Sequence, residues 1–529
     1  MASIADIEKT RLVRQREIDA ARSAEDRNRL GQFATPGALA HEILNLAHTR
    51  WGPGRGRVRF LDPALGTGSF FAALVKEFGP ASIESATGYE LDETFARTAD
   101  ALWRDYGLAV IHGDFTTARP PRLKAERPNL IVCNPPYVRH HHIAAEEKLR
   151  LQRLAGSLAR VNLNGLAGLY CYFLLLAHAW MADDALALWL IPSEFMDVNY
   201  GRAVREYLCT QVRLLRVHRF DPAEVQFDDA LVSSAVVLLE NTPVSPSDRV
   251  ELTYGGSLAS PGRTHTVTVR ELAQSSNWSG LSRHRHGERK PMADGAERDV
   301  TVGDLFEIKR GLATGANDFF ILERARAAEL ELPATCLTPI LPSPRYLSCD
   351  VIEGDADGFP VLEKQLVLLD CRLPESTVRN RYPRLWTYLA SGRKAVLPNR
   401  YLCKGRQPWY RQELRPPAPF LCTYMGREGG EGPFRFIWNQ SRATATNVYL
   451  LMYPRGAMRE ALKSDPGQLA KVHAALKTLS PQDIVGEGRT YGGGLHKIEP
   501  RELGRLSARA LTDALPQLVR FQEAQGRLF

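Results

Sequence analysis

Short apolar runs alternate with amphipathic stretches between Gly31 and Glu240. Stretches such as SFFAALVKEF have the helical spacing of apolar positions, whereas the runs between such stretches look like buried strands. Strands that alternate with helices predict a doubly wound, mainly parallel sheet. Because the last two expected strands are close in the chain, we expect an antiparallel pair at that edge. The expected strands are VRFLDPA, SATGYEL, LAVIHGD, PNLIVCNPP, ALALWLIP, LLRVHRF and ALVSSAVVLLE.

The alternation stops at Asn241, where the segment NTPVSPSD is rich in Pro and Ser and is typical of a linker. Beyond it Pro and Gly are scattered, and Arg and aromatic residues are more frequent. A chain of 529 residues is also too long to fold around a single hydrophobic core. We therefore expect a helical extension over residues 1–30, an α/β domain over 31–241 and a separate mixed α/β domain over 242–529.

Charge and cysteine usage narrow the class of protein. The 68 Lys and Arg residues exceed the 60 Asp and Glu residues, which gives a net charge of +8 and favours a polyanionic partner. None of the eight cysteines forms a C-x-x-C pair, so we expect no zinc ribbon and no disulfide, as in a cytoplasmic protein. The N-terminus has no signal-peptide pattern, and the apolar stretch 167–181 is too short to span a membrane.

A glycine loop follows the first expected strand in LDPALGTGSFF. Gly66 and Gly68 let the backbone approach a ligand at the carboxyl end of the strand. A dinucleotide loop or a plain tight turn remains open, but D-P-x-x-G-x-G differs from G-x-G-x-x-G and favours S-adenosylmethionine (SAM). The expected cofactor contacts here are Asp62, Ala64, Gly66 and Gly68.

The next two strands end in residues suited to the rest of such a cofactor. Glu90, in GYELD, lies 28 residues after Asp62 and can accept hydrogen bonds from ribose hydroxyls. Asp114, in HGDF, can accept from an adenine amine while Phe115 packs on the ring. A surface carboxylate is the alternative for Glu90.

The fourth strand ends in Asn134, Pro135, Pro136 and Tyr137, the most informative tetrapeptide of the chain. An exocyclic adenine amine is a poor nucleophile because its lone pair is delocalised into the ring. The Asn134 side-chain oxygen and the Pro135 carbonyl can accept its two hydrogens and return electron density to nitrogen. The two prolines stiffen the loop, and Tyr137 can stack on the base. The structural alternative is a Pro-Pro turn.

Other chemistries fit less well. The chain has no Pro-Cys dipeptide, which argues against cytosine-C5 methylation through a cysteine nucleophile. A base inside a duplex must be flipped out to react, so a second aromatic wall is needed. Phe227 can supply it, with core packing as an equal alternative.

His140, His141 and His142 lack partners at ligand spacing, so we expect no metal.

Together these motifs resemble the gamma-class (TaqI-like) DNA adenine-N6 methyltransferases of Type II restriction-modification systems. GQFATP, DPALGTGSFF, GYELD, GDF, NPPYVRHHHI and LIPSEFMDVNYGRAVREYL follow in that family's order, and IKRGLATGANDFFIL and YGGGLHKIEPREL resemble parts of its recognition domain. The resemblance implies a Rossmann-like class I SAM methyltransferase fold. It also implies that Thr35, Asp62, Glu90 and Asp114 hold SAM and that Asn134, Pro135, Tyr137 and Phe227 hold the adenine.

The resemblance further implies that residues 242–529 read the DNA sequence. Arg310, Arg406, Arg411, Arg442 and Trp438 are candidate readers, although the arginines can equally bind phosphates and Trp438 can belong to a core. We expect double-stranded DNA as substrate, a monomer, and a cognate restriction endonuclease that acts separately. RNA methylation, protein-glutamine N5 methylation and a non-catalytic DNA-reading module remain as alternatives.

Overall fold

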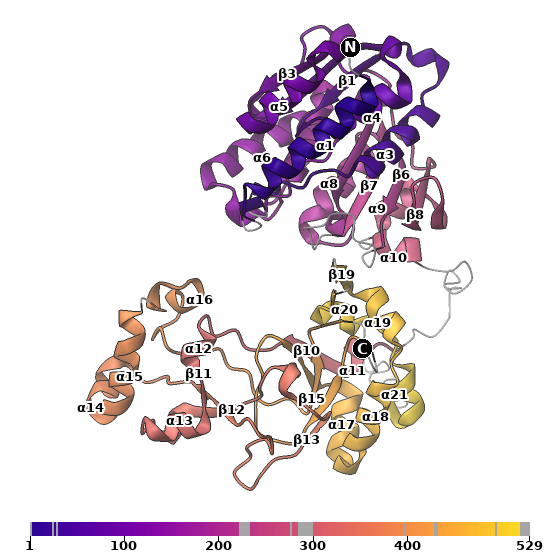
Figure 1. The fold of residues 1–529 in the computed structure, drawn as a ribbon. Helices are drawn as coiled ribbons and strands as arrows, with labels where there is room; N and C mark the ends of the chain where they lie inside the picture. The colour runs from indigo at the N-terminus through magenta and orange to yellow at the C-terminus, as the bar shows by residue number, and fades with distance from the viewer. Residues whose placement is uncertain are drawn as a thin grey trace. The chain divides into compact units, whose positions relative to one another are not determined.

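The computed structural model gathers the apolar runs of the first half into one sheet (Figure 1). It describes residues 3–23, 26–27, 30–221, 233–275, 278–283, 300–395, 397–427, 432–491 and 495–518. The chain divides into two compact units, Met1–Glu288 with Tyr491–Gly493, and Arg289–Thr490 with Gly494–Phe529.

The sheet of the first unit has nine strands in the order β3-β2-β1-β4-β5-β7-β6-β8-β9. Strands β1 to β5 run parallel, and β7 lies antiparallel between β5 and β6. The doubly wound sheet and the antiparallel pair are thus confirmed, and all seven expected runs form strands. The strands are β1 (Val58–Asp62), β2 (Ile83–Glu90), β3 (Leu108–His112), β4 (Leu130–Cys133), β5 (Leu186–Pro192), β6 (Arg213–Arg219), β7 (Ser234–Glu240), β8 (Arg249–Gly256) and β9 (Pro261–Thr268).

Central strands are apolar throughout because helices cover both of their faces. Every residue of β4 and β5 is buried. The helices pack in two groups, one containing α1, α3, α4 and α5 and the other containing α6, α7 and α8. The helices of this unit are α1 (Ile4–Ala20), α3 (Gly37–Thr49), α4 (Ser69–Phe78), α5 (Glu93–Trp103), α6 (Ala145–Ala159), α7 (Leu169–Ala177), α8 (Arg202–Thr210), α9 (Val269–Gln274) and α10 (Trp278–Arg283).

The predicted domain boundary at residue 241 is wrong. β8 pairs in parallel with β6, and β9 pairs with β8, so the first unit continues to Glu288. The segment NTPVSPSD is therefore a loop between two strands of one sheet. The expected 1–30 extension is helical over α1, and this helix packs against α4 and α5 of the first unit.

The second unit confirms the expected separate mixed α/β domain. Its largest sheet has the order β10-β18-β15-β17-β13, and a three-stranded sheet has the order β11-β14-β12. Its strands are β10 (Phe306–Arg310), β11 (Ile321–Glu323), β12 (Leu337–Ile340), β13 (Val351–Ile352), β14 (Leu366–Leu369), β15 (Phe420–Thr423), β16 (Met425–Arg427), β17 (Phe436–Asn439), β18 (Tyr449–Pro454), β19 (Arg489–Tyr491) and β20 (Leu495–Lys497).

Separate apolar cores lie against these two sheets. The helices of the second unit are α11 (Val302–Leu305), α12 (Asn317–Phe320), α13 (Arg324–Glu329), α14 (Glu375–Arg381), α15 (Pro383–Lys394), α16 (Tyr401–Lys404), α17 (Gly456–Ser464), α18 (Leu469–Lys477), α19 (Pro481–Glu487), α20 (Pro500–Gly504) and α21 (Arg509–Ala514).

Candidate active site

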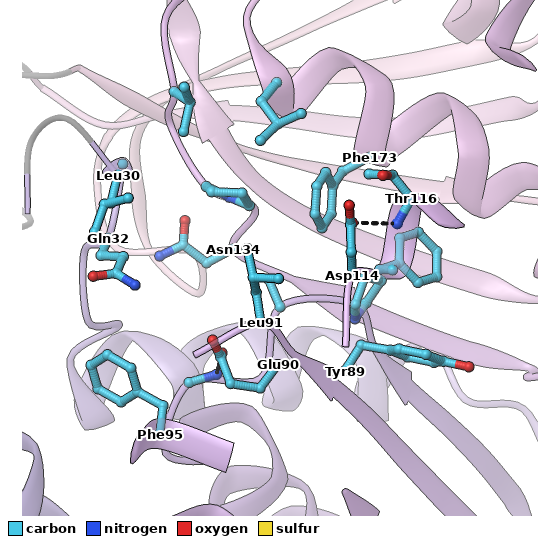
Figure 2. A pocket seen from close by; sticks show the side chains of 18 of the residues that line it. Leu30, Gln32, Tyr89, Glu90, Leu91, Phe95, Asp114, Thr116, Asn134 and Phe173 are labelled. Carbon is cyan, nitrogen blue, oxygen red and sulfur yellow. Dashed lines mark hydrogen bonds between the residues drawn. The ribbon is translucent and has the colours of Figure 1, made fainter. Parts of the chain in front are cut away.

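A cavity of about 380 Å³ lies at the carboxyl ends of the parallel strands. Four neighbouring strands send residues to it: Ala64 and Gly66 follow β1, Glu90 ends β2, Asp114 follows β3, and Asn134 follows β4. Figure 2 shows Glu90, Asp114 and Asn134 converging on this space. The β1–β4 neighbourhood is the point where the strand order reverses, the usual ligand site of an open α/β sheet.

The carboxylate of Glu90, at the end of β2, binds the backbone of the glycine loop. Glu90 accepts hydrogen bonds from the Gly66 amide (2.8 Å) and the Asp92 amide (2.8 Å). Burial raises the pKa of Glu90 above its ordinary value. Gly68 adopts φ +88°, and a Cβ there would lie 2.7 Å from Trp103 Nε1. Only glycine therefore fits this turn.

Asp62 is placed differently from the prediction. Its side chain is 1% exposed and is not among the described residues that line the cavity. One oxygen accepts from the Ala64 amide (3.1 Å), and Oδ2 accepts from no residue that the structure describes. Burial raises the pKa of Asp62 to about 8. In this structure Asp62 therefore binds the backbone of the glycine loop without lining the cavity.

Asp114 and Phe115 form the far end of the cavity. Asp114 accepts from the Thr116 amide (2.8 Å), the bond drawn in Figure 2. The Phe115 ring packs against Phe173 and Trp180, with centroids 5.6 and 5.2 Å away. Asp114 and Phe115 both line the cavity, although the Phe115 side chain is only 2% exposed.

The segment before α3 fixes the orientation of the Asn134 amide. Asn134 Nδ2 donates to the Phe33 carbonyl (3.0 Å) and to Thr35 Oγ1 (3.1 Å). A carbonyl can only accept, so the nitrogen must lie on that side. Asn134 Oδ1 is buried and accepts no hydrogen bond from the described part of the chain. The side chain thus keeps one acceptor unused beside the cavity that it lines.

Thr35 therefore contacts Asn134, although it is not among the described lining residues itself. Its neighbours Phe33 and Ala34 do line the cavity. The segment is held by close backbone packing. Gly31 has φ +65°, its carbonyl accepts from the Tyr137 amide (3.1 Å), and a Cβ on Gly31 would lie 2.4 Å from Tyr137 N.

The two prolines and Tyr137 occupy different positions. Pro136 lines the cavity, whereas Pro135 and Tyr137 are not among its described lining residues. The Tyr137 side chain is 8% exposed, its hydroxyl donates to the Leu190 carbonyl (3.1 Å), and its ring lies 5.6 Å from that of Phe33. Burial raises the pKa of Tyr137 far above its ordinary value. Phe227, the second expected base wall, lies outside the described residues.

Sequence reasoning missed the contribution of α1. Gln15 and Asp19 line the cavity, and Arg11 bonds to Thr67 inside the glycine loop. The only signal is the spacing of these three polar residues at every fourth position, which an exposed helix face shows equally well. His140–His142 form a short 3-10 turn from which His142 lines the cavity, and no group of three metal-binding side chains occurs among the described residues.

Two family models and several known proteins are similar to this chain. Residues 95–226 match the model described as "Eco57I restriction-modification methylase", and residues 288–524 match the C-terminal domain of Type II methyltransferase M.Eco57I. The chain is 25% identical over 504 residues to Type II methyltransferase M.AccI of Acinetobacter calcoaceticus, covering 93% of this chain and 87% of the relative. It is 27% identical over 492 residues to M.XamI of Xanthomonas campestris pv. amaranthicola, covering 90% and 85%.

The chain is thus similar in both of its units to Type II restriction-modification methyltransferases. Among solved structures it is similar to the Type IIL restriction-modification enzyme MmeI in complex with DNA, with a TM-score of 0.52 and 13% identity. That match covers 82% of this chain and 61% of the MmeI chain, so the chain spans less than two thirds of that structure. The match shows a shared fold.

The C-terminal match of this chain begins at residue 288, next to the unit boundary in the structure. Within that unit the candidate readers differ. Arg406 donates to the carbonyls of Thr314 and Ala313 (2.8 and 2.7 Å), so it braces the fold. Trp438 packs against an apolar core. The remaining candidates are exposed: Arg310, whose guanidinium lies over the Tyr424 ring, and Arg411 and Arg442.

None of the helices that the structure describes has the length and apolar character needed to cross a membrane.

Proposed function

We propose that this chain transfers a methyl group from SAM to N6 of adenine in double-stranded DNA, at a short sequence read by its C-terminal unit. The similarity of this chain to Type II methyltransferases supports methylation as its activity. The observation that carries the choice of an exocyclic amine is the Asn134 amide, oriented by Phe33 and Thr35 so that Oδ1 is left as an unused buried acceptor.

The cavity fits SAM in size and in chemistry. About 380 Å³ lies within the usual range for small-ligand sites. Glu90 lies where the ribose hydroxyls are expected, Asp114 can accept from the adenine amine of the cofactor, and Phe115 offers a ring face. When bound, SAM supplies an electrophilic methyl group. The chain holds the cofactor with these residues and with the glycine loop.

The residues of the NPPY loop orient the target amine. Asn134 Oδ1 and the Pro135 carbonyl accept its two hydrogens, which favours pyramidal nitrogen and directs the lone pair towards the methyl group. Proximity and orientation then supply much of the rate, and no covalent bond to the enzyme is needed. Burial of the acceptor strengthens its effect, because no water competes for it.

The target base must leave the duplex to reach this loop. Tyr137 and Phe227 are proposed to hold the flipped base. In the structure the Tyr137 ring contacts Phe33, so this role requires the loop to offer the ring face once DNA binds. We also propose that Arg411 and Arg442 contact DNA and that a separate endonuclease cleaves the same, unmodified sequence.

The test is to incubate the full chain with methyl-labelled SAM and, in parallel, unmethylated duplex DNA, cellular RNA and a release factor. Labelled N6-methyladenine from DNA alone is expected, and Asn134→Ala should abolish it. Label in RNA or in the release factor would contradict the proposed substrate. Label recovered as N4-methylcytosine would keep the DNA substrate and overturn the adenine, since the exocyclic amine of cytosine presents the same lone-pair problem.

A further inference from the structure

The N-terminal helix α1 forms part of the wall of the cofactor cavity. Its Gln15 and Asp19 side chains line the cavity together with Gly66, Glu90 and Leu91. The helix packs against α4, which follows the glycine loop, and against α5, which follows β2. It therefore passes over the two loops expected to hold the cofactor.

At one point α1 holds the glycine loop directly. Arg11 is 1% exposed and donates through Nη1 to Thr67 Oγ1 (3.0 Å), while its other nitrogens bind the Glu8 carboxylate (2.6 and 2.7 Å). The Thr67 hydroxyl donates in turn to Gln15 Oε1 (2.8 Å). The Thr67 carbonyl accepts from Trp103 Nε1 (3.0 Å), so both the side chain and the backbone of this residue are hydrogen-bonded.

A buried guanidinium is expensive unless every donor is used in good geometry. Each of the three Arg11 nitrogens donates one hydrogen bond, two to Glu8 and one to Thr67, so displacement of Thr67 would remove the bond of Nη1. The same network therefore restrains the loop between Gly66 and Gly68. Restraint of a binding loop before the ligand arrives increases affinity by reducing the ordering required on binding.

The far end of α1 reaches the ribose side of the cavity. Arg22, just beyond the helix, donates to Asp92 (2.5 Å) and to Gln32 (2.6 Å). Asp92 is two residues beyond Glu90, the expected ribose acceptor, and its amide is bound by that carboxylate. Asp19 lies in the last turn of α1, three residues before Arg22, and accepts a hydrogen bond from Gln15 Nε2 (3.0 Å).

We propose that α1 is part of the cofactor site: Asp19 accepts a hydrogen bond from a ribose hydroxyl opposite Glu90, and Arg11 and Gln15 position the glycine loop through Thr67. Asp19 is thus a cofactor-binding residue, and Arg11 and Gln15 are positioning residues. This inference rests on the proposed use of SAM.

The first experiment measures binding by calorimetry to the full chain, with no DNA present. Asp19→Ala is compared with Glu17→Ala, a matched carboxylate removal on the same helix at an exposed position, where the carboxylate pairs with Arg14. A hydrogen bond to a charged acceptor predicts at least a tenfold loss of affinity for Asp19→Ala and wild-type affinity for Glu17→Ala. Thermal unfolding of both variants checks that each remains folded.

The ligand series assigns the contact. SAM, S-adenosylhomocysteine and 5′-methylthioadenosine share the ribose, but only the first two carry the amino-acid part. An equal loss for all three with Asp19→Ala supports the ribose contact. A loss confined to SAM and S-adenosylhomocysteine overturns it in favour of the ammonium group. Wild-type affinity of Asp19→Ala for all three ligands refutes a contact, whereas no binding by the unaltered chain refutes the proposed use of SAM instead.

Thr67 tests the positioning role. Thr67→Val removes the hydroxyl that bridges Arg11 and Gln15 at nearly constant volume, and Thr67→Ser restores it. We expect a several-fold loss of SAM affinity for the valine variant and near wild-type affinity for the serine variant. Equal affinities for the two variants, with both folded, would overturn the role of the network.

Discussion

Replacing Asn134 by alanine separates its structural role from its chemical one. The alanine loses two hydrogen bonds, to the Phe33 carbonyl and to Thr35 Oγ1. At about 0.5–1.5 kcal/mol each, their loss lowers the free energy of unfolding by about 1–3 kcal/mol. The same change removes the buried acceptor Oδ1, which accepts no hydrogen bond from the described residues. Loss of one preorganised partner of the reacting group typically slows an enzyme about 100-fold or more, about 2.7 kcal/mol.

Asn134→Asp provides the comparison. It also loses both donated bonds, and it sets a carboxylate oxygen against the Phe33 carbonyl, so its stability should fall at least as far as that of the alanine variant. It keeps an acceptor, however, and should retain more activity. Stability and activity are therefore expected to rank the two variants differently.

The assay is single-turnover methylation of saturating duplex DNA, with SAM affinity and thermal unfolding measured on the same preparations. We expect Asn134→Ala to bind SAM nearly as well as the unaltered chain and to transfer methyl groups at least about 100-fold more slowly. Activity of the alanine variant within a few-fold of wild type would refute the assigned role. A rate loss matched by an equal loss of SAM affinity would place the defect in the cofactor site.

Further changes test other parts of the account. Gly31→Ala should lower the unfolding temperature and the activity together, since φ is +65° and a Cβ would meet Tyr137 N at 2.4 Å; an unchanged unfolding temperature would contradict this. Because burial raises the pKa of Asp62 to about 8 from 3.8, the folded chain holds a proton that the unfolded chain releases, and this residue's contribution to stability should fall as pH rises from about 4 to 8. Asp62→Asn should flatten that slope in urea titrations across pH. A duplex mismatched at the target adenine should bind more tightly than the matched duplex, because unpairing is already done; equal affinities would argue against flipping. Arg406→Ala should lower the unfolding temperature, whereas Arg411→Ala should leave it unchanged and either flatten the salt dependence of DNA binding by about one unit of slope or relax one position of the site.

The sheet was predictable where strands are buried on both faces. β4 and β5 appear as continuous apolar runs because helices cover both sides. β8 and β9 escaped notice because only half of the residues of β8 and one residue of β9 are buried. The Pro- and Ser-rich segment before β8 therefore resembled a linker. In the second unit, β10 pairs with β18, about 140 residues later in the chain, and no local pattern encodes such a pairing.

The sequence predicts those residues of the candidate site that directly follow a buried strand. Glu90, Asp114 and Asn134 each follow an apolar run, so their meeting at one edge follows from the parallel sheet. The orientation of the Asn134 amide was not predictable, since it depends on Phe33, a residue about 100 positions earlier. The contribution of α1 was not predictable for the same reason. Arg11, Gln15 and Asp19 are polar residues at every fourth position, and only the packing of the helix brings Gln15 and Asp19 to the cavity and Arg11 to Thr67.

The central claim is tested most directly by sequencing the methylome of a methylation-deficient host that expresses this chain. The account predicts N6-methyladenine at one adenine of a single short motif, in nearly every copy, and no such mark in a host expressing Asn134→Ala. Methylation of cytosine, methylation without a sequence motif, or a motif fully modified by the Asn134→Ala variant would contradict it.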